Sequence, residues 1–213
     1  MTKQPTARES AKQKRNNAIL YHAEKLFLRK GIDNTTMNDI ADHAGIGIAT
    51  LFRYFPKKDQ IILAIATEKI HIMLDEFYRI EQEPLSCYGK IEAVLDFFIH
   101  KMMEPEAALP KILDNFINYA AVSEEEMKEM DMYTKARKEI NRVCIRMIEE
   151  GKSDGTLRSD LDPVAILPTM LSNFSVFTLK LSLIGSTNLI EPALSPLNQL
   201  QIMKDIFLNY IKP

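Results

Sequence analysis

The fold is decided by residues 34–62, NTTMNDIADHAGIGIATLFRYFPKKDQII. The hydroxyl of Thr36 and the carboxylate of Asp39, three residues later, have the spacing of a capping box, which predicts the start of a helix. Gly45 and Gly47 predict the end of that short helix and a tight turn after it. A second short helix follows directly. Two short helices joined by a turn that contains glycine are typical of a helix-turn-helix.

The second short helix is expected from about Ile48 to Phe55, because Leu51 and Phe55 lie four residues apart on one face and Pro56 prevents continuation. A Gly-x-Gly sequence at the start of a helix can also belong to a dinucleotide-binding turn. That fingerprint needs a third glycine, which Thr50 replaces, and it follows a strand rather than a helix. The sequence therefore favours the helix pair.

The rest of the chain is expected to be helical, so that the fold class is all-α. A helix over residues 10–30 shows one apolar face and ends before Gly31, which completes a three-helix head. The downstream part shows longer apolar periodicities, and we expect further helices at about 57–82, 85–104, 112–122, 123–151, 163–184 and 196–212. The helix at 123–151 is predicted to start with a capping box of Ser123 and Glu126. We expect one domain over residues 1–56 and a second, larger domain over residues 57–213.

Composition and charge narrow the class of protein. With 46% hydrophobic and 26% charged residues in 213 positions, the chain has the composition of an ordinary globular protein. Residues 1–60 hold eleven Lys and Arg against six Asp and Glu, whereas the remaining residues hold sixteen against 23. A basic head on an acidic body suggests that the head meets a polyanion such as DNA.

The cellular location follows from weaker signals. Cys87 and Cys144 are too far apart for a zinc motif and form no disulfide framework, and the polar N-terminus shows no secretory signal, so we expect a cytoplasmic protein. Residues 163–184 are apolar on nearly every side, but two prolines, Asn173 and Lys180 argue against a membrane span. We expect this helix to be covered by the body on one side and by a second copy of the chain on the other. The predicted homodimer uses the last two helices, 163–184 and 196–212.

The second short helix has side chains suited to the major groove. Thr50 and Ile48 can place methyl groups on thymine, and Arg53 can reach a guanine or a phosphate. The hydroxyl of Tyr54 and the ammonium of Lys58 can bind backbone phosphates, which positions a protein without reading sequence.

At this point a family resemblance is clear. The stretch resembles the DNA-binding segment of TetR-family transcriptional regulators over about residues 15–65, through Thr35-Thr36, Ile40-Ala41, Gly45-Ile46, Thr50-Leu51-Phe52, Tyr54-Phe55 and Lys58-Asp59. The remaining residues match only in architecture. The resemblance implies a dimeric, ligand-responsive repressor that binds a palindromic double-stranded DNA operator. It implies a DNA-binding domain over residues 1–56 and a ligand-binding and dimerisation domain over residues 57–213. The DNA-facing positions that it implies are Thr36, Asn38, Gly47, Ile48, Ala49, Thr50, Phe52, Arg53, Tyr54 and Lys58.

Three of these positions depart from the family pattern. Gly47 stands where the family commonly has serine, Ile48 where a polar or basic residue is common, and Phe52 where tyrosine is usual. The recognition helix is therefore more apolar than usual. We expect its specificity to depend on methyl contacts, on Arg53 and on DNA shape.

The helical body contains residues suited to a small-molecule effector site. Met and Phe side chains on successive helices can line an adaptable apolar cavity, although many of them are equally suited to a plain core. We expect an apolar or aromatic effector. The candidate residues are Phe98, Met102, Phe116, Tyr119, Met147, Met170, Asn173, Phe174 and Phe177.

Other functions are less well supported. His22, His43, His71 and His100 are scattered without metal-ligand spacing, and no nucleophile, carboxylate pair or phosphate loop is visible. We therefore expect no metal, no cofactor and no catalysis. The alternative is a helical small-molecule carrier or protein-interaction module without specific DNA binding.

Overall fold

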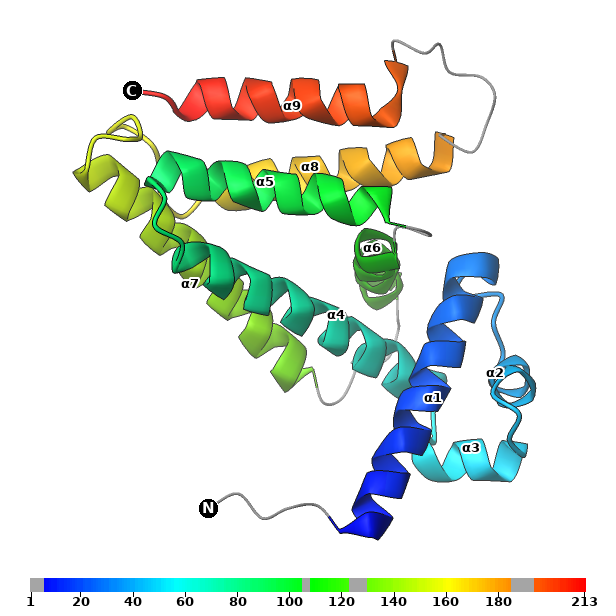
Figure 1. The fold of residues 1–213 in the computed structure, drawn as a ribbon. Coiled ribbons are helices and arrows are strands. Elements are labelled where there is room, and N and C mark those ends of the chain that lie inside the picture. The colour runs from blue at the N-terminus through cyan, green and yellow to red at the C-terminus, as the bar shows by residue number, and fades with distance from the viewer. Residues whose placement is uncertain (1–5, 105–107, 123–129, 185–193) are drawn as a thin grey trace.

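The computed structural model describes residues 6–104, 108–122, 130–184 and 194–213. Within these ranges the regular structure is α-helical, as the sequence predicts (Figure 1). The helices are α1 (Ala7–Lys30), α2 (Met37–His43), α3 (Ile48–Tyr54), α4 (Lys58–Glu81), α5 (Cys87–Met103), α6 (Ala108–Val122), α7 (Asp131–Ser153), α8 (Ile166–Ile184) and α9 (Pro196–Ile211).

The first three helices form the head. α1 packs against α2, and α2 against α3 (Figure 1). Ile19, Ala23 and Phe27 of α1 are buried with Ile40 of α2 and Leu51 of α3. This apolar cluster holds the two short helices, which would be unstable in isolation, in a fixed orientation.

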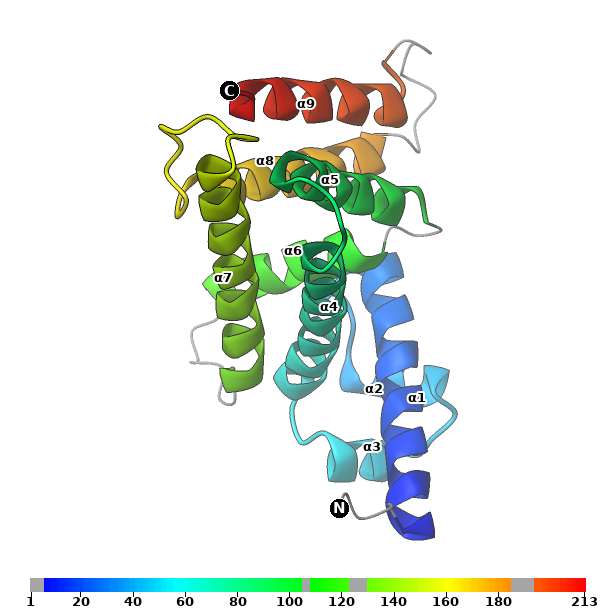
Figure 2. The same cartoon turned by 60° about the vertical axis from the view of Figure 1, so that its left-hand side comes forward.

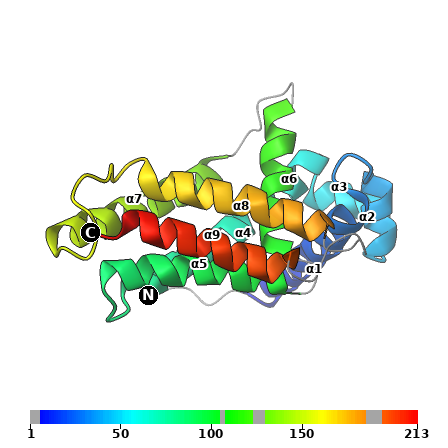
Figure 3. The ribbon, with the colours of Figure 1, turned by 90° about the horizontal axis from the view of Figure 1, so that it is seen from above.

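The other six helices form the body. α4 and α7 run side by side (Figure 2), and α5, α8 and α9 lie alongside one another when the molecule is seen from above (Figure 3). α6 contacts α4, α5 and α8 of the body and also α1 of the head. It is therefore placed where a change in the body can reach the head.

The predicted helix boundaries agree with the structure except at a few ends. α8 begins at Ile166 rather than near residue 163, because the Asp162 carboxylate accepts hydrogen bonds from the Val164 and Ala165 amides and holds these residues in a turn. The predicted capping box of Ser123 and Glu126 lies outside the described residues. The predicted boundary between residues 56 and 57 falls in the connection between α3 and α4, and the division into two domains stays a prediction.

The apolar helix α8 buries only part of its circumference within one chain. Leu167, Met170, Phe174 and Leu181 are buried, whereas the side chain of Val176 is 62% exposed. Among the described residues, none of the helices combines the length and the apolar character needed to cross a membrane.

Candidate nucleic-acid interface

The turn between α2 and α3 is a Schellman motif. The Ile46 amide donates to the Ala41 carbonyl at 3.0 Å, and the Gly45 amide donates to the Asp42 carbonyl at 3.1 Å. Gly45 has a φ of 64°, a left-handed conformation that glycine adopts without steric cost. The chain therefore leaves α2 sharply, and Gly47, at the N-cap of α3, starts the next helix two residues later.

The start of α2 is fixed by the predicted capping box. Thr36 accepts from the Asp39 amide at 3.1 Å, and Asp39 accepts from the Thr36 amide at 2.9 Å. Lys30 of α1 forms a 2.9 Å salt bridge with the same carboxylate. The hydrogen bond from the Thr36 amide, and then that from Lys30, hold the pKa of Asp39 well below its usual value.

One face of α3 packs inside the head, and the opposite face is exposed to solvent. Leu51 of α3 and Phe55, its C-cap residue, are buried in the apolar core. Ile48 and Phe52, one turn apart, are 37% and 46% exposed although both are large and apolar. The exposed side of α3 consists of Ile48, Ala49, Phe52 and Arg53. In Figures 1 and 2, α3 lies at the lower end of the molecule with no part of the body beyond it, so this face is accessible to a partner.

A hollow of about 560 Å³ lies between α1 and α3, and we call it the basic groove. Its lining includes Arg8, Lys12 and Arg15 of α1 together with Arg53 and Tyr54 of α3. The three α1 cations are four and three residues apart, so they share one face of the helix. The described lining contains no acidic side chain, so this surface suits a phosphate backbone.

The sequence-based prediction of DNA-facing residues does not include the α1 residues that line the basic groove. The first fifteen residues read as a polar tail, but the structure continues α1 back to Ala7, capped by Thr6 and Glu9. The spacing of Arg8, Lys12 and Arg15 is the signal in the sequence that indicates this face.

Lys58 has a structural role in the head. Its ammonium donates to the carbonyls of Ile32 at 3.0 Å and Thr35 at 3.2 Å, which ties the start of α4 to the loop before α2. One N–H donor is left for a phosphate, so its DNA contact stays a prediction. Thr36 and Asn38 are exposed at the start of α2, Thr50 is half-buried, and the Thr36 hydroxyl is already used in its cap.

The effector candidates do not form one group. Phe98 of α5 and Phe174 of α8 are buried in contact, with ring centroids 6.3 Å apart, and Met147 and Met170 are also buried. Phe177 is half-buried. The side chain of Met102 lies outside the described part of the structure.

Three other candidates have separate surroundings. Phe116 is buried against Tyr133 of α7, with ring centroids 4.6 Å apart. The Tyr119 hydroxyl donates to Asp59 of α4 at 2.6 Å. Asn173 is exposed and donates to the Thr169 carbonyl of its own helix, so it lies on the outer face of α8.

Comparison with known proteins agrees with this geometry. A sequence model of the family described as "Bacterial regulatory proteins, tetR family" matches residues 19–65, which contain the second half of α1, all of α2 and α3 and the start of α4. Residues 19–65 therefore form a TetR-family DNA-binding segment. The TetR family consists of regulatory proteins, which agrees with the prediction that the chain is not an enzyme.

Relatives of known sequence or structure extend the TetR-family match beyond the head. An HTH-type transcriptional regulator of Staphylococcus aureus (strain USA300) is 31% identical over 102 residues, which are 48% of this chain and 55% of the relative. The chain thus spans about half the length of this curated relative. The ketosteroid transcriptional regulator KstR2 of Mycobacterium tuberculosis has a TM-score of 0.70 at 18% identity, over 93% of this chain and 95% of that one. A regulator of the TetR/AcrR family from Thermobifida fusca has a TM-score of 0.65 at 25% identity, over 92% and 97% of the two chains. The body therefore shares the TetR-family fold as well.

Proposed function

We propose that the chain is a dimeric transcriptional repressor, acting in the bacterial cytoplasm, that binds a two-fold symmetric DNA operator and releases or binds it in response to a small apolar or aromatic effector. The observation that carries this proposal is the exposed face of α3 next to the basic groove. Ile48 and Phe52 form an exposed apolar surface one turn apart on α3, and thymine methyl groups can pack on such a surface. The cations beside them supply the phosphate contacts that fix the helix in the groove.

The dimer interface is proposed on the outer faces of α8 and α9. Ile202, Ile206 and Tyr210 of α9 are spaced four residues apart and are 58%, 61% and 53% exposed. Val176 of α8 is exposed to a similar extent. The opposite side of α9 is already held by the body, because buried Lys204 forms salt bridges to Asp96 and Glu92 of α5. A helix fixed on one side with an apolar stripe on the other suits pairing with a second copy.

The effector is proposed to bind among the apolar side chains of α5, α7 and α8, near Phe98, Met147 and Phe174. These side chains are buried on three different helices, and methionine can rearrange to admit a ligand. A ligand here would change how α6 packs, because α6 contacts both α5 and α8.

Polar contacts offer a route from α6 to the head. Tyr119 of α6 holds Asp59 at the start of α4, and the neighbouring Lys58 holds the loop before α2 through Ile32 and Thr35. A shift of α6 would therefore be transmitted to the position of α2 and α3. Both heads of a dimer must fit one duplex, so a small shift would cost DNA affinity.

The test is selection of binding sites from random double-stranded DNA, followed by gel shifts at two salt concentrations. The proposal predicts an enriched inverted repeat and an affinity that falls steeply with salt. A helical carrier without specific DNA binding would enrich no sequence. That result would reject the proposal and favour the carrier.

A further inference from the structure

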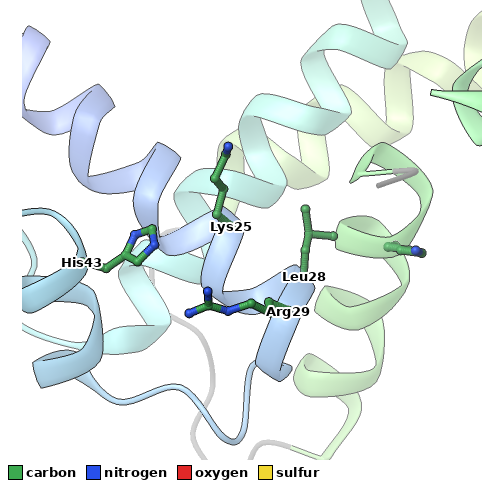
Figure 4. A pocket seen from close by; sticks show the side chains of 5 residues that line it. Lys25, Leu28, Arg29 and His43 are labelled. Carbon is green, nitrogen blue, oxygen red and sulfur yellow. The ribbon is translucent and has the colours of Figure 1, made fainter. Parts of the chain in front are cut away.

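A second group of cations lies at the opposite end of α1 from the basic groove. A hollow of about 350 Å³ is lined by Lys25, Leu28 and Arg29 of α1, His43 of α2 and Lys111 of α6. We call it the junction pocket, because its walls come from both the head and the body. In Figure 4, Arg29 extends towards the side on which His43 lies, and Leu28 points towards α6.

Two cations of the junction pocket, Arg29 and Lys111, have no acidic partner among the described residues. No acidic side chain lines the described wall, and no described carboxylate forms a salt bridge with either of them. Other lysines of the head and of α4 are paired, since Lys30 bridges to Asp39 and Lys69 to Glu24. Lys25 also has a partner, the Tyr21 ring, whose centroid lies 4.8 Å from the Lys25 ammonium.

Helix dipoles account for only part of this cluster. Arg29 lies in the last turn of α1 and His43 in the last turn of α2, where positive charge stabilises a helix. Lys111 of α6 lies far from the last turn of its helix, which ends at Val122, so no helix C-terminus accounts for its place in the cluster. A bound anion would give Lys111 a partner and use the other two cations as well.

The junction pocket is separate from the proposed DNA surface. Arg15 and Arg29 are 14 residues apart along α1, which corresponds to about 21 Å at the rise of an α-helix. The two hollows share no lining residue. α6 forms one wall of the junction pocket, whereas α3 lies at the other end of the head (Figure 1).

The side chains that line the junction pocket indicate which class of ligand it can bind. Arg29 offers a fork of N–H donors that matches a phosphate, and the Lys111 ammonium adds a point charge. His22 and His43 face each other with their Nδ1 atoms 3.0 Å apart, so one donates and the other accepts, and Nε2 of His43 remains for a ligand. Leu28 adds an apolar surface. The volume is near the lower end of the range of small-molecule sites, about 300–1,000 Å³.

We propose that the junction pocket is a second ligand site, distinct from the apolar effector site, that binds a phosphorylated small molecule through Arg29, Lys111 and His43. Such a ligand would join α6 to α1 and α2 and so stabilise one placement of the head on the body. This regulatory consequence rests on the proposed function, whereas the binding itself does not.

The experiment is isothermal titration calorimetry of the full chain with pyrophosphate, in the absence of DNA. The variants are Arg29→Gln and Lys111→Gln, singly and together. The matched control is Lys14→Gln, which removes an exposed α1 cation that lines neither hollow. Each single variant is expected to weaken binding roughly tenfold, because a hydrogen-bonded charge pair is lost, and the double variant to abolish it. Lys14→Gln is expected to bind like the wild type.

A further arm separates the two basic hollows. The variant Arg8→Gln/Arg15→Gln should bind pyrophosphate with unchanged affinity. Loss of binding in that variant would assign the anion to the basic groove and overturn the proposal. Absence of heat with the wild type, or equal weakening by Lys14→Gln, would also overturn it. Circular dichroism of each variant checks that the helices are intact, and because no DNA is present, the result does not depend on whether the chain binds an operator.

Discussion

The basic groove makes a quantitative prediction about the salt dependence of DNA binding. The perturbation is the triple variant Arg8→Gln/Lys12→Gln/Arg15→Gln, which removes every α1 cation in the lining of the groove. A dimer loses six positive charges. Each phosphate neutralised contributes about −0.9 to the slope of log affinity against log salt, so the slope should become shallower by up to about 5. The expected range is about 3 to 5, since not every cation needs to contact a phosphate.

The assay is fluorescence anisotropy with the selected operator duplex over a series of salt concentrations. Lys14→Gln serves as the control for the loss of an exposed α1 charge outside the groove, and its slope should match the wild type. The three substitutions leave the capping box of Thr6 and Glu9 intact, so α1 is expected to remain folded. A slope that changes by less than about 1 in the triple variant would refute the assignment of the groove to phosphate.

Three further predictions concern the head and the dimer. Gly45→Ala should lower the free energy of unfolding in urea by about 1–2 kcal/mol, because φ is 64° and only backbone strain is added; an unchanged value would contradict the Schellman turn. The low pKa of Asp39 predicts that its contribution to stability is complete above about pH 4 and is lost as the pH falls further. The free energy of unfolding, measured against pH, should therefore fall more steeply in acid for the wild type than for Asp39→Asn. Parallel curves for the two proteins would refute this. Ile202→Asp/Ile206→Asp should shift the chain from dimer to monomer in analytical ultracentrifugation while the helix content is retained, and a variant that remains dimeric would exclude this face of α9.

The head could be predicted from the sequence in detail because its structure is set by local interactions. The capping box of Thr36 and Asp39, the glycine at Gly45 and the stop at Pro56 each involve residues within a few positions of one another. Local interactions of this kind can be predicted from the spacing of residue types alone. The salt bridge from Lys30 to Asp39 joins two helices and was not predicted.

Features that depend on packing between distant segments could not be predicted. The sequence shows His22 and His43 as scattered, whereas the structure brings their rings to a centroid distance of 5.0 Å. The sequence places Lys58 on DNA, but two of its N–H donors reach carbonyls about 25 residues earlier in the chain. Both contacts depend on how α1, α2 and α4 cross, and a single sequence does not contain that information.

The exposed side of α9 also could not be predicted from the sequence. Apolar residues at every third or fourth position predict an apolar stripe along α9, but this spacing does not show which side of the helix the body covers. The structure buries Leu200, Lys204 and Leu208 and leaves Ile202 and Ile206 outside. The body needs one side of the helix, and the second apolar side is what indicates a partner.

The proposed function requires that the exposed face of α3 lies in the major groove of a two-fold symmetric site. Methylation interference at guanine N7, an atom in the major groove, measures this placement. We expect two interference clusters related by two-fold symmetry for the wild type, and loss of the same guanines from both clusters in Arg53→Ala. Interference confined to one cluster, or a pattern unchanged by Arg53→Ala and by Ile48→Ala, would reject this placement of α3.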